Sequence, residues 1–330
     1  MNLGLLRLTI VLAFTVVVLG AYTRLSDAGL GCPDWPGCYG KISVPDNPDH
    51  IDKSNEVYAS RPLERAKAWK EMIHRYAAGT LGFLIVILAV LSWKNRGRGG
   101  PLILPVFLVV LVIIQALLGM WTVTLLLKPI IVMGHLLGGM TILLLLMWFY
   151  LKQRHRVTRA DVRPSPLHAW AILCLAVVFM QISLGGWTSA NYAALICPDF
   201  PVCQGQWWPA MDFRDGFLPW RGLGTNYEFG VLGPQARTAI HVSHRIGAVL
   251  TLIIVGTTAI KAMLAPEWKI KSAGIVLLLV LITQFSLGVA NVLLTLPIGV
   301  AVTHNGVAAL LLVCTGMLLF HTRYSTTIRS

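Results

Sequence analysis

Charged residues are scarce in this chain of 330 residues: they make up 12% of it, whereas hydrophobic residues make up 56%. The mean hydropathy of +0.70 is too high for an ordinary soluble domain. Acidic residues are scarcer than basic ones, with 14 Asp and Glu against 27 Lys and Arg. A net charge of +13 can indicate nucleic-acid binding, but here the basic residues lie between apolar segments, so we interpret them as signals of membrane topology.

In place of charged residues, the chain contains long apolar segments. A bilayer core of about 30 Å needs about 20 apolar residues per helix. Such segments lie near residues 5–22, 72–93, 101–124, 130–151, 167–188, 238–260, 270–294 and 298–320. The sequence therefore predicts an all-α integral membrane protein with eight transmembrane helices. In the first segment Arg7 precedes an apolar run, as in a signal peptide. No A-x-A cleavage site follows, so we expect a retained helix.

Basic residues cluster in three short connections between these segments, at residues 94–100, 152–163 and 261–271. Lys and Arg near the ends of membrane spans favour the cytoplasmic side. We therefore expect these connections and both termini in the cytoplasm. The long segments 23–71 and 189–237 would then lie outside, which in a bacterium is the periplasmic side of the inner membrane.

The chain also repeats itself at an interval of about half its length. Residues 19–23 and 32–38 return 165 positions later as residues 184–188 and 197–203. Later matches, at 169 or 170 positions, join His74-Arg75 with His244-Arg245, Gln115 with Gln284, Gly119 with Gly288, and His135 with His304. Four spans return the chain to its starting side, so we expect two tandem pseudo-symmetric four-helix bundles, residues 1–163 and 164–330.

Four histidines lie at one depth of their predicted helices, near the outer surface: His74, His135, His244 and His304. Ionisable groups inside a membrane are costly and are therefore functional candidates. Each half offers one histidine from its second helix and one from its fourth, which suits two axial ligands on one heme iron. A lone intramembrane histidine more often bridges helices by a hydrogen bond, but two matched pairs favour heme. Zinc is disfavoured because nothing supplies further ligands at that depth.

The residues beside these histidines differ between the halves. Arg75 and Arg245 directly follow two of them and could pair with heme propionates or with lipid headgroups. Glu71 precedes His74 by one helical turn, whereas His241 occupies the matching position in the second half. A carboxylate near a bound heme can act as a base or stabilise a developing cation. We therefore expect the chemistry in the N-terminal half, the alternative being that Glu71 is a solvated residue at a helix start.

Two of the predicted outer loops each contain a pair of cysteines, Cys32 with Cys38 and Cys197 with Cys203. In an oxidising compartment we expect one disulfide within each loop. The spacing is not C-x-x-C, so a structural role is favoured over a thiol redox relay. The other two cysteines, Cys174 and Cys314, lie inside predicted spans as packing thiols.

Together these motifs resemble those of the heme A synthase family. The matching segments are Glu71-Met72-Ile73-His74-Arg75, Gly134-His135, His241-Val242-Ser243-His244-Arg245, Thr303-His304-Asn305 and the two C-P-D-[WF]-P-x-C loops. The resemblance covers essentially the whole chain. It implies an oxidoreductase that oxidises the C8 methyl group of heme O to a formyl group, which gives heme A for terminal oxidases.

The resemblance also implies a role for each histidine pair. His74 and His135 would flank the substrate heme O, with Glu71 as the essential acidic residue, and His244 and His304 would ligate a resident heme b. Some members of the family lack the loop cysteines. The sequence leaves open the electron acceptor, the oligomeric state, including a homo-oligomer, and whether heme O comes directly from a farnesyltransferase, the heme O synthase.

Two other classes of function remain as alternatives. A di-heme membrane cytochrome that transfers electrons to or from quinol also uses paired histidines, but it predicts hemes at both membrane depths, whereas these four histidines lie on one side. A heme transporter or chaperone would also suit the repeat and the outer loops. Such a carrier would return its heme unmodified.

Overall fold

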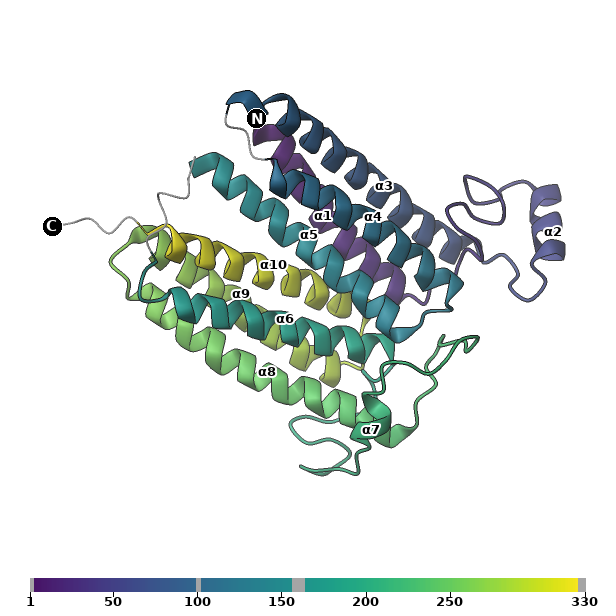
Figure 1. Ribbon diagram of the computed structural model, residues 1–330. Helices are drawn as coiled ribbons and strands as arrows, with labels where there is room; N and C mark the ends of the chain where they lie inside the picture. The colour runs from purple at the N-terminus through teal and green to yellow at the C-terminus, as the bar shows by residue number, and fades with distance from the viewer. Residues whose placement is uncertain (1–2, 99–101, 156–163, 326–330) are drawn as a thin grey trace.

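The computed structural model describes residues 3–98, 102–155 and 164–325, and this part of the chain is helical with no strands (Figure 1). Eight of its helices are long and apolar enough to cross a membrane, which confirms the predicted number of spans. They are α1 (Leu3–Leu25), α3 (Arg65–Lys94), α4 (Ile103–Thr124), α5 (Pro129–His155), α6 (His168–Ala190), α8 (Pro234–Met263), α9 (Trp268–Leu293) and α10 (Ile298–Arg323).

Helices α3 and α8 begin earlier than hydropathy predicted. Helix α3 begins at Arg65 rather than near residue 72, and α8 begins at Pro234 rather than near residue 238. Hydropathy detects only the apolar part of a helix, whereas the backbone hydrogen bonds continue through polar residues. Proline also suits a first helical turn, since its missing N–H would have no partner there. As a result Glu71 lies inside α3 and not at its start.

Two short helices lie in the segments predicted as outer loops, and the sequence analysis did not predict them. Helix α2 (Pro48–Val57) is capped by Asn47, whose side chain accepts the Asp49 N–H. Helix α7 (Phe213–Gly216) is capped by Asp212 in the same way. Both lie at the end of the molecule opposite the start of α1 (Figure 1). They were missed because polar helices of this length carry no transmembrane signal.

The eight long helices form two groups of four that lie side by side, α1 with α3, α4 and α5, and α6 with α8, α9 and α10 (Figure 1). The groups meet where α1 and α5 pack against α6 and α10. A continuous apolar core crosses this junction and includes Leu143, Phe149 and Phe320. The predicted boundary between the halves, after residue 163, falls at the edge of the described residues. The pseudo-symmetry of the halves stays a prediction.

The long loop after α6 reaches across to the N-terminal half. Arg61 and Glu228 form an ion pair with an N–O distance of 2.9 Å, and the Tyr227 N–H donates to the Leu126 carbonyl at 3.0 Å. Lys128 is buried beneath the same loop and donates to the Gly222 carbonyl. The outer end of the N-terminal bundle is therefore covered in part by the C-terminal half.

Candidate functional site

A cavity of about 1520 Å³ lies between the helices and is lined by both halves. The structure brings every predicted site residue to this cavity: Glu71, His74, Arg75, His135, His241, His244, Arg245 and His304. The sequence predicted two separate heme sites. Both histidine pairs line this one cavity, and the division into two heme sites stays a prediction.

The N-terminal pair faces across this cavity. His74 on α3 and His135 on α5 have ring centroids 6.4 Å apart and planes at 83°. A metal–imidazole bond is about 2 Å long, so two imidazoles on one ion have centroids roughly 6 Å apart. The Nδ1 atoms of both rings are buried and have no hydrogen-bond partner among the described residues. The distance between these rings is compatible with two ligands on one ion. That the two histidines bind a heme iron stays a prediction.

A glycine on a neighbouring helix makes room for each of the four histidines. A Cβ atom would lie 3.0 Å from the His74 ring at Gly20, 3.3 Å from His135 at Gly119, 3.1 Å from His244 at Gly185 and 3.2 Å from His304 at Gly288. Glycine lets a ring approach the backbone this closely. The sequence analysis found these glycines as repeat positions but missed their contacts with the histidines. Their recurrence, at 165 positions for Gly20 and Gly185 and at 169 for Gly119 and Gly288, was the available signal.

These contacts predict a strong effect of added bulk at one glycine. We expect Gly185→Val to push the His244 ring out of place and to lower the heme content of the purified protein by at least about threefold, since overpacked sites force side chains off their rotamers. Gly299→Val is the matched control, because a Cβ atom there meets nothing within 4 Å. The heme-to-protein absorbance ratio measures both, and equal ratios would show that the contact does not position the ring.

The histidines of the C-terminal half have glutamine partners. The His244 Nδ1 atom lies 3.0 Å from the Gln181 amide nitrogen, which also donates to the His244 carbonyl. The His304 Nε2 atom lies 3.3 Å from the Gln284 amide nitrogen. Groups that hold a ligating imidazole fix its orientation. Gln181 was missed by the sequence analysis, although a polar residue inside a span, at the position that matches Val16, was a signal for it.

Glu71 is only 5% exposed, so it is not a solvated residue. One carboxylate oxygen accepts the Cys32 N–H at 2.8 Å and the other accepts a hydrogen bond from Arg75 at 2.5 Å. At the matching position, the His241 Nδ1 atom lies 2.9 Å from the Ala193 carbonyl. A buried carboxyl group thus lies one helical turn from His74, where the C-terminal half has an imidazole.

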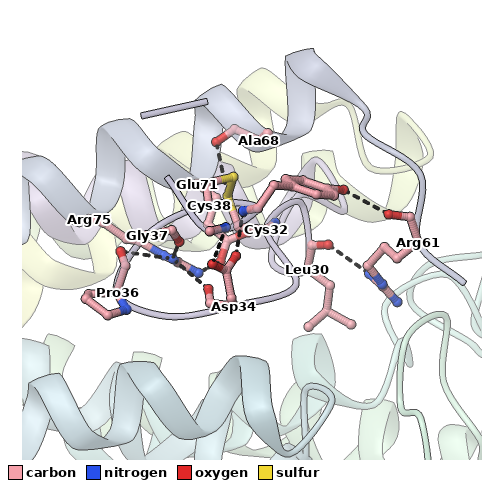
Figure 2. Close-up of a disulfide and its surroundings, with 12 residues drawn as sticks. Leu30, Cys32, Asp34, Pro36, Gly37, Cys38, Arg61, Ala68, Glu71 and Arg75 are labelled. Carbon is pink, nitrogen blue, oxygen red and sulfur yellow. Dashed lines mark hydrogen bonds and ion pairs between the residues drawn. A yellow bond between two sulfur atoms is a disulfide. The ribbon is translucent and has the colours of Figure 1, made fainter. Parts of the chain in front are cut away.

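Arg75 and Arg245 hold the cysteine loops against the helices that carry His74 and His244. Arg75 donates to the carbonyls of Asp34 and Gly37, as Figure 2 shows. Arg245 donates to four carbonyls of the matching loop, those of Cys197, Asp199, Pro201 and Val202. Their terminal nitrogens are thus occupied by protein. Pairing of these arginines with heme propionates stays a prediction. In the described chain, the buried Nε–H of Arg245 has no hydrogen-bond partner and could donate to a propionate.

Each cysteine loop is closed by a disulfide, as predicted. Cys32 pairs with Cys38, as Figure 2 shows, and Cys197 pairs with Cys203. An aspartate organises each loop: Asp34 accepts the N–H groups of residues 39 and 40, and Asp199 those of residues 204 and 205. The Gly205 N–H in particular holds the pKa of Asp199 below its usual value. In the first loop, burial raises the pKa of Tyr39 to about 12.

We expect thiol labelling to distinguish the six cysteines. In protein denatured without a reductant, Cys174 and Cys314, which are free, should react in full, and the four loop cysteines should react only after reduction. Mass spectrometry of the labelled peptides measures this. Labelling of loop cysteines before reduction, in protein purified from an oxidising compartment, would contradict the disulfides.

The fold and the site define an integral membrane protein with two pairs of intramembrane histidines on one cavity. Residues 4–315 match the family of cytochrome oxidase assembly proteins, and the chain belongs to this family. It is 45% identical to a heme A synthase of Shewanella oneidensis over 98% of both chains. It is 27% identical to a heme A synthase of Caulobacter vibrioides, over 91% of this chain and 90% of that one. A heme A synthase of Bacillus licheniformis is 25% identical, over 91% and 89%.

Proposed function

We propose that this chain is a heme A synthase, which oxidises the C8 methyl group of heme O to a formyl group and supplies heme A to a terminal oxidase. The observation that carries the proposal is the convergence of four histidines on one cavity of about 1520 Å³, with one histidine from each of two helices in either half. The relative with 45% identity over 98% of both chains bears this name.

The residues present fit heme. The paired rings of His74 and His135 have the spacing of two axial ligands. A glycine beside each histidine lets a flat macrocycle and its ligand lie close to the backbone. The cavity wall is mainly apolar, with the buried carboxylate of Glu71 and two arginines near the cysteine loops. Such a wall suits a porphyrin, whose faces are apolar and whose propionates are charged.

We assign the substrate heme O to His74 and His135 in residues 1–163, and a resident heme b to His244 and His304 in residues 164–330. Two differences between the halves support this division. Gln181 holds His244, as suits a permanent cofactor, whereas the matching position beside His74 is Val16. Glu71 lies one turn from His74, whereas the C-terminal half has His241 there.

Bound heme iron supplies the oxidising chemistry, and the residues of the chain supply position and charge. Oxidation of a methyl group passes through electron-deficient carbon, which the Glu71 carboxylate would stabilise. Arg75, 2.5 Å from one carboxylate oxygen, would hold this carboxylate in position. Two successive hydroxylations with oxygen from water, each releasing two electrons and two protons, followed by loss of one water molecule would give the formyl group. The reaction removes hydrogen from the substrate, so it needs an electron acceptor as a partner.

We further propose that the cysteine loops face the periplasm and that both termini face the cytoplasm. Disulfides persist in oxidising compartments, which favours the periplasmic side for Cys32–Cys38 and Cys197–Cys203. Basic residues end the helices at the opposite end, including Lys94, Arg154 and Lys261. Heme O would then be taken up near the outer surface, from the membrane or from a heme O synthase.

Expression in a bacterial strain that makes heme O but lacks its own heme A synthase tests the function. We expect heme A among the hemes extracted from these cells and identified by mass, and none in cells that carry an empty vector. A transporter or chaperone would leave heme O unmodified. A quinol cytochrome would add heme b and quinol-dependent heme reduction, without heme A.

A further inference from the structure

The two halves differ in how closely their second and third helices pack. Helices α8 and α9 pack against each other along much of their length, whereas α3 and α4 pack less closely. At Gly82 the two helices of the N-terminal half approach each other, since a Cβ atom there would lie 3.1 Å from Val112. At Gly79, one turn nearer the histidines, a Cβ atom would meet nothing within 4 Å. There is therefore a gap, meaning open space beside α3, at the level of Gly79.

The side chains at this gap are smaller than those at the matching positions of the C-terminal half. On α3, Gly79 and Gly82 follow Arg75 at the spacing that places them on one face of the helix. On α8 the matching residues, 170 positions later, are Val249 and Leu252. The facing helices differ in the same direction. Val112 and Ala116 of α4 correspond, at 169 positions, to Leu281 and Phe285 of α9.

The gap is continuous with the histidine cavity. Gly79 on α3 and Ala116 on α4 line the same cavity as His74 and His135, and both residues are exposed. The rings of those two histidines lie on the wall of that cavity, and their Nδ1 atoms are buried without a hydrogen-bond partner in the described chain. The opening lies between transmembrane helices. A molecule that extends through it would meet the acyl chains of the bilayer.

We propose that this opening receives the isoprenoid side chain of the heme substrate and makes the N-terminal site selective for heme O. The inference rests on the proposed function. Heme O differs from heme b by a long isoprenoid group on the macrocycle, which no site of porphyrin dimensions can enclose without an additional channel. The opening lets the chain lie against lipid while the macrocycle lies between His74 and His135. In the C-terminal half the larger side chains of Val249 and Phe285 occupy the matching positions, which suits a heme with short substituents.

Two variants that introduce the residues of the C-terminal half test this proposal from opposite walls, Gly79→Val and Ala116→Phe. In the full-length protein, purified with its resident heme, we expect each to raise the KM for heme O by at least about tenfold with kcat little changed, because the loss is one of binding. Heme B has the macrocycle without the isoprenoid chain, so its inhibition constant against heme O should stay within about twofold. Phe83→Val, on the exposed face of α3 and away from the cavity, is the control and should match the wild type.

An unchanged KM for heme O in both variants would overturn the proposal. So would a rise in the inhibition constant of heme B equal to the rise in KM, since the macrocycle would then be the group excluded. If Gly79→Val loses its resident heme and does not fold, Ala116→Phe on the other helix decides. A wild-type protein that does not oxidise heme O at all would instead refute the proposed function, and this inference with it.

Discussion

Glu71→Gln should leave the heme content near that of the wild type and lower heme A formation by roughly 100-fold or more, which is the scale for losing one preorganised electrostatic group. Glutamine retains the volume of the Glu71 side chain and an oxygen that can accept the Cys32 N–H. In the unmodified protein this N–H donates to the Glu71 carboxylate at 2.8 Å. It cannot carry the charge that pairs with Arg75. Arg75 would still donate to the loop carbonyls, so the loop should remain in place.

The measurement compares heme A formation, per unit of resident heme, between Glu71→Gln and the wild type in a strain that lacks its own synthase. Glu64→Gln is the matched control, because Glu64 is an exposed carboxylate just before α3 that pairs only weakly with Lys67. Heme A output at the wild-type level from Glu71→Gln would remove this carboxylate from the mechanism. A loss of resident heme in that variant would point instead to a structural role for the ion pair.

Replacement of the histidines should separate the two sites. We expect His244→Leu or His304→Leu to remove most of the b-type absorbance from the purified protein, since a low-spin heme needs both axial ligands. His74→Leu or His135→Leu should keep most of that absorbance and abolish the conversion of heme O. The substrate site turns over and need not be filled when the protein is isolated. His168→Leu is the control, because His168 lies outside the cavity, at the start of α6.

Two outcomes would contradict this assignment of the histidine pairs. If the N-terminal variants lose the resident heme while the C-terminal variants keep it, the two roles are exchanged between the halves. Equal loss from all four variants would show that the two bundles fold as one cooperative unit, because mutations in coupled sites do not act independently. The helices α1, α5, α6 and α10, which pack across the junction of the halves, are where such coupling would arise.

The sequence predicted the parts of this molecule that follow from composition and spacing. Eight spans follow from hydropathy because the lipid imposes its thickness on every helix. The four histidines were found because ionisable residues inside spans are rare and these recur at matching positions. Glu71 was found by contrast, because His241 occupies the matching position in the second half. The disulfide pairs follow from two cysteines within one short loop.

Contacts between helices could not be predicted in this way, because they depend on how helices cross. The approach of Gly20 to His74 and of Gln181 to His244 requires the rotation of each helix about its axis. The engagement of Arg75 by the Asp34 and Gly37 carbonyls depends on a loop fold that spacing does not encode. Both histidine pairs line one cavity because of how the two halves pack, and no local sequence pattern predicts this packing.

The central claim is that two histidine pairs on one cavity have separate tasks. The most direct test identifies both hemes in one sample before and after the reaction. Purified protein that retains its resident heme is incubated with heme O and an electron acceptor, and all hemes are then extracted and identified by mass. The account predicts that heme b is recovered unchanged, while heme O is converted to a product with one more oxygen atom and two fewer hydrogen atoms. Recovery of heme O unmodified, in protein whose resident heme is intact, would contradict it.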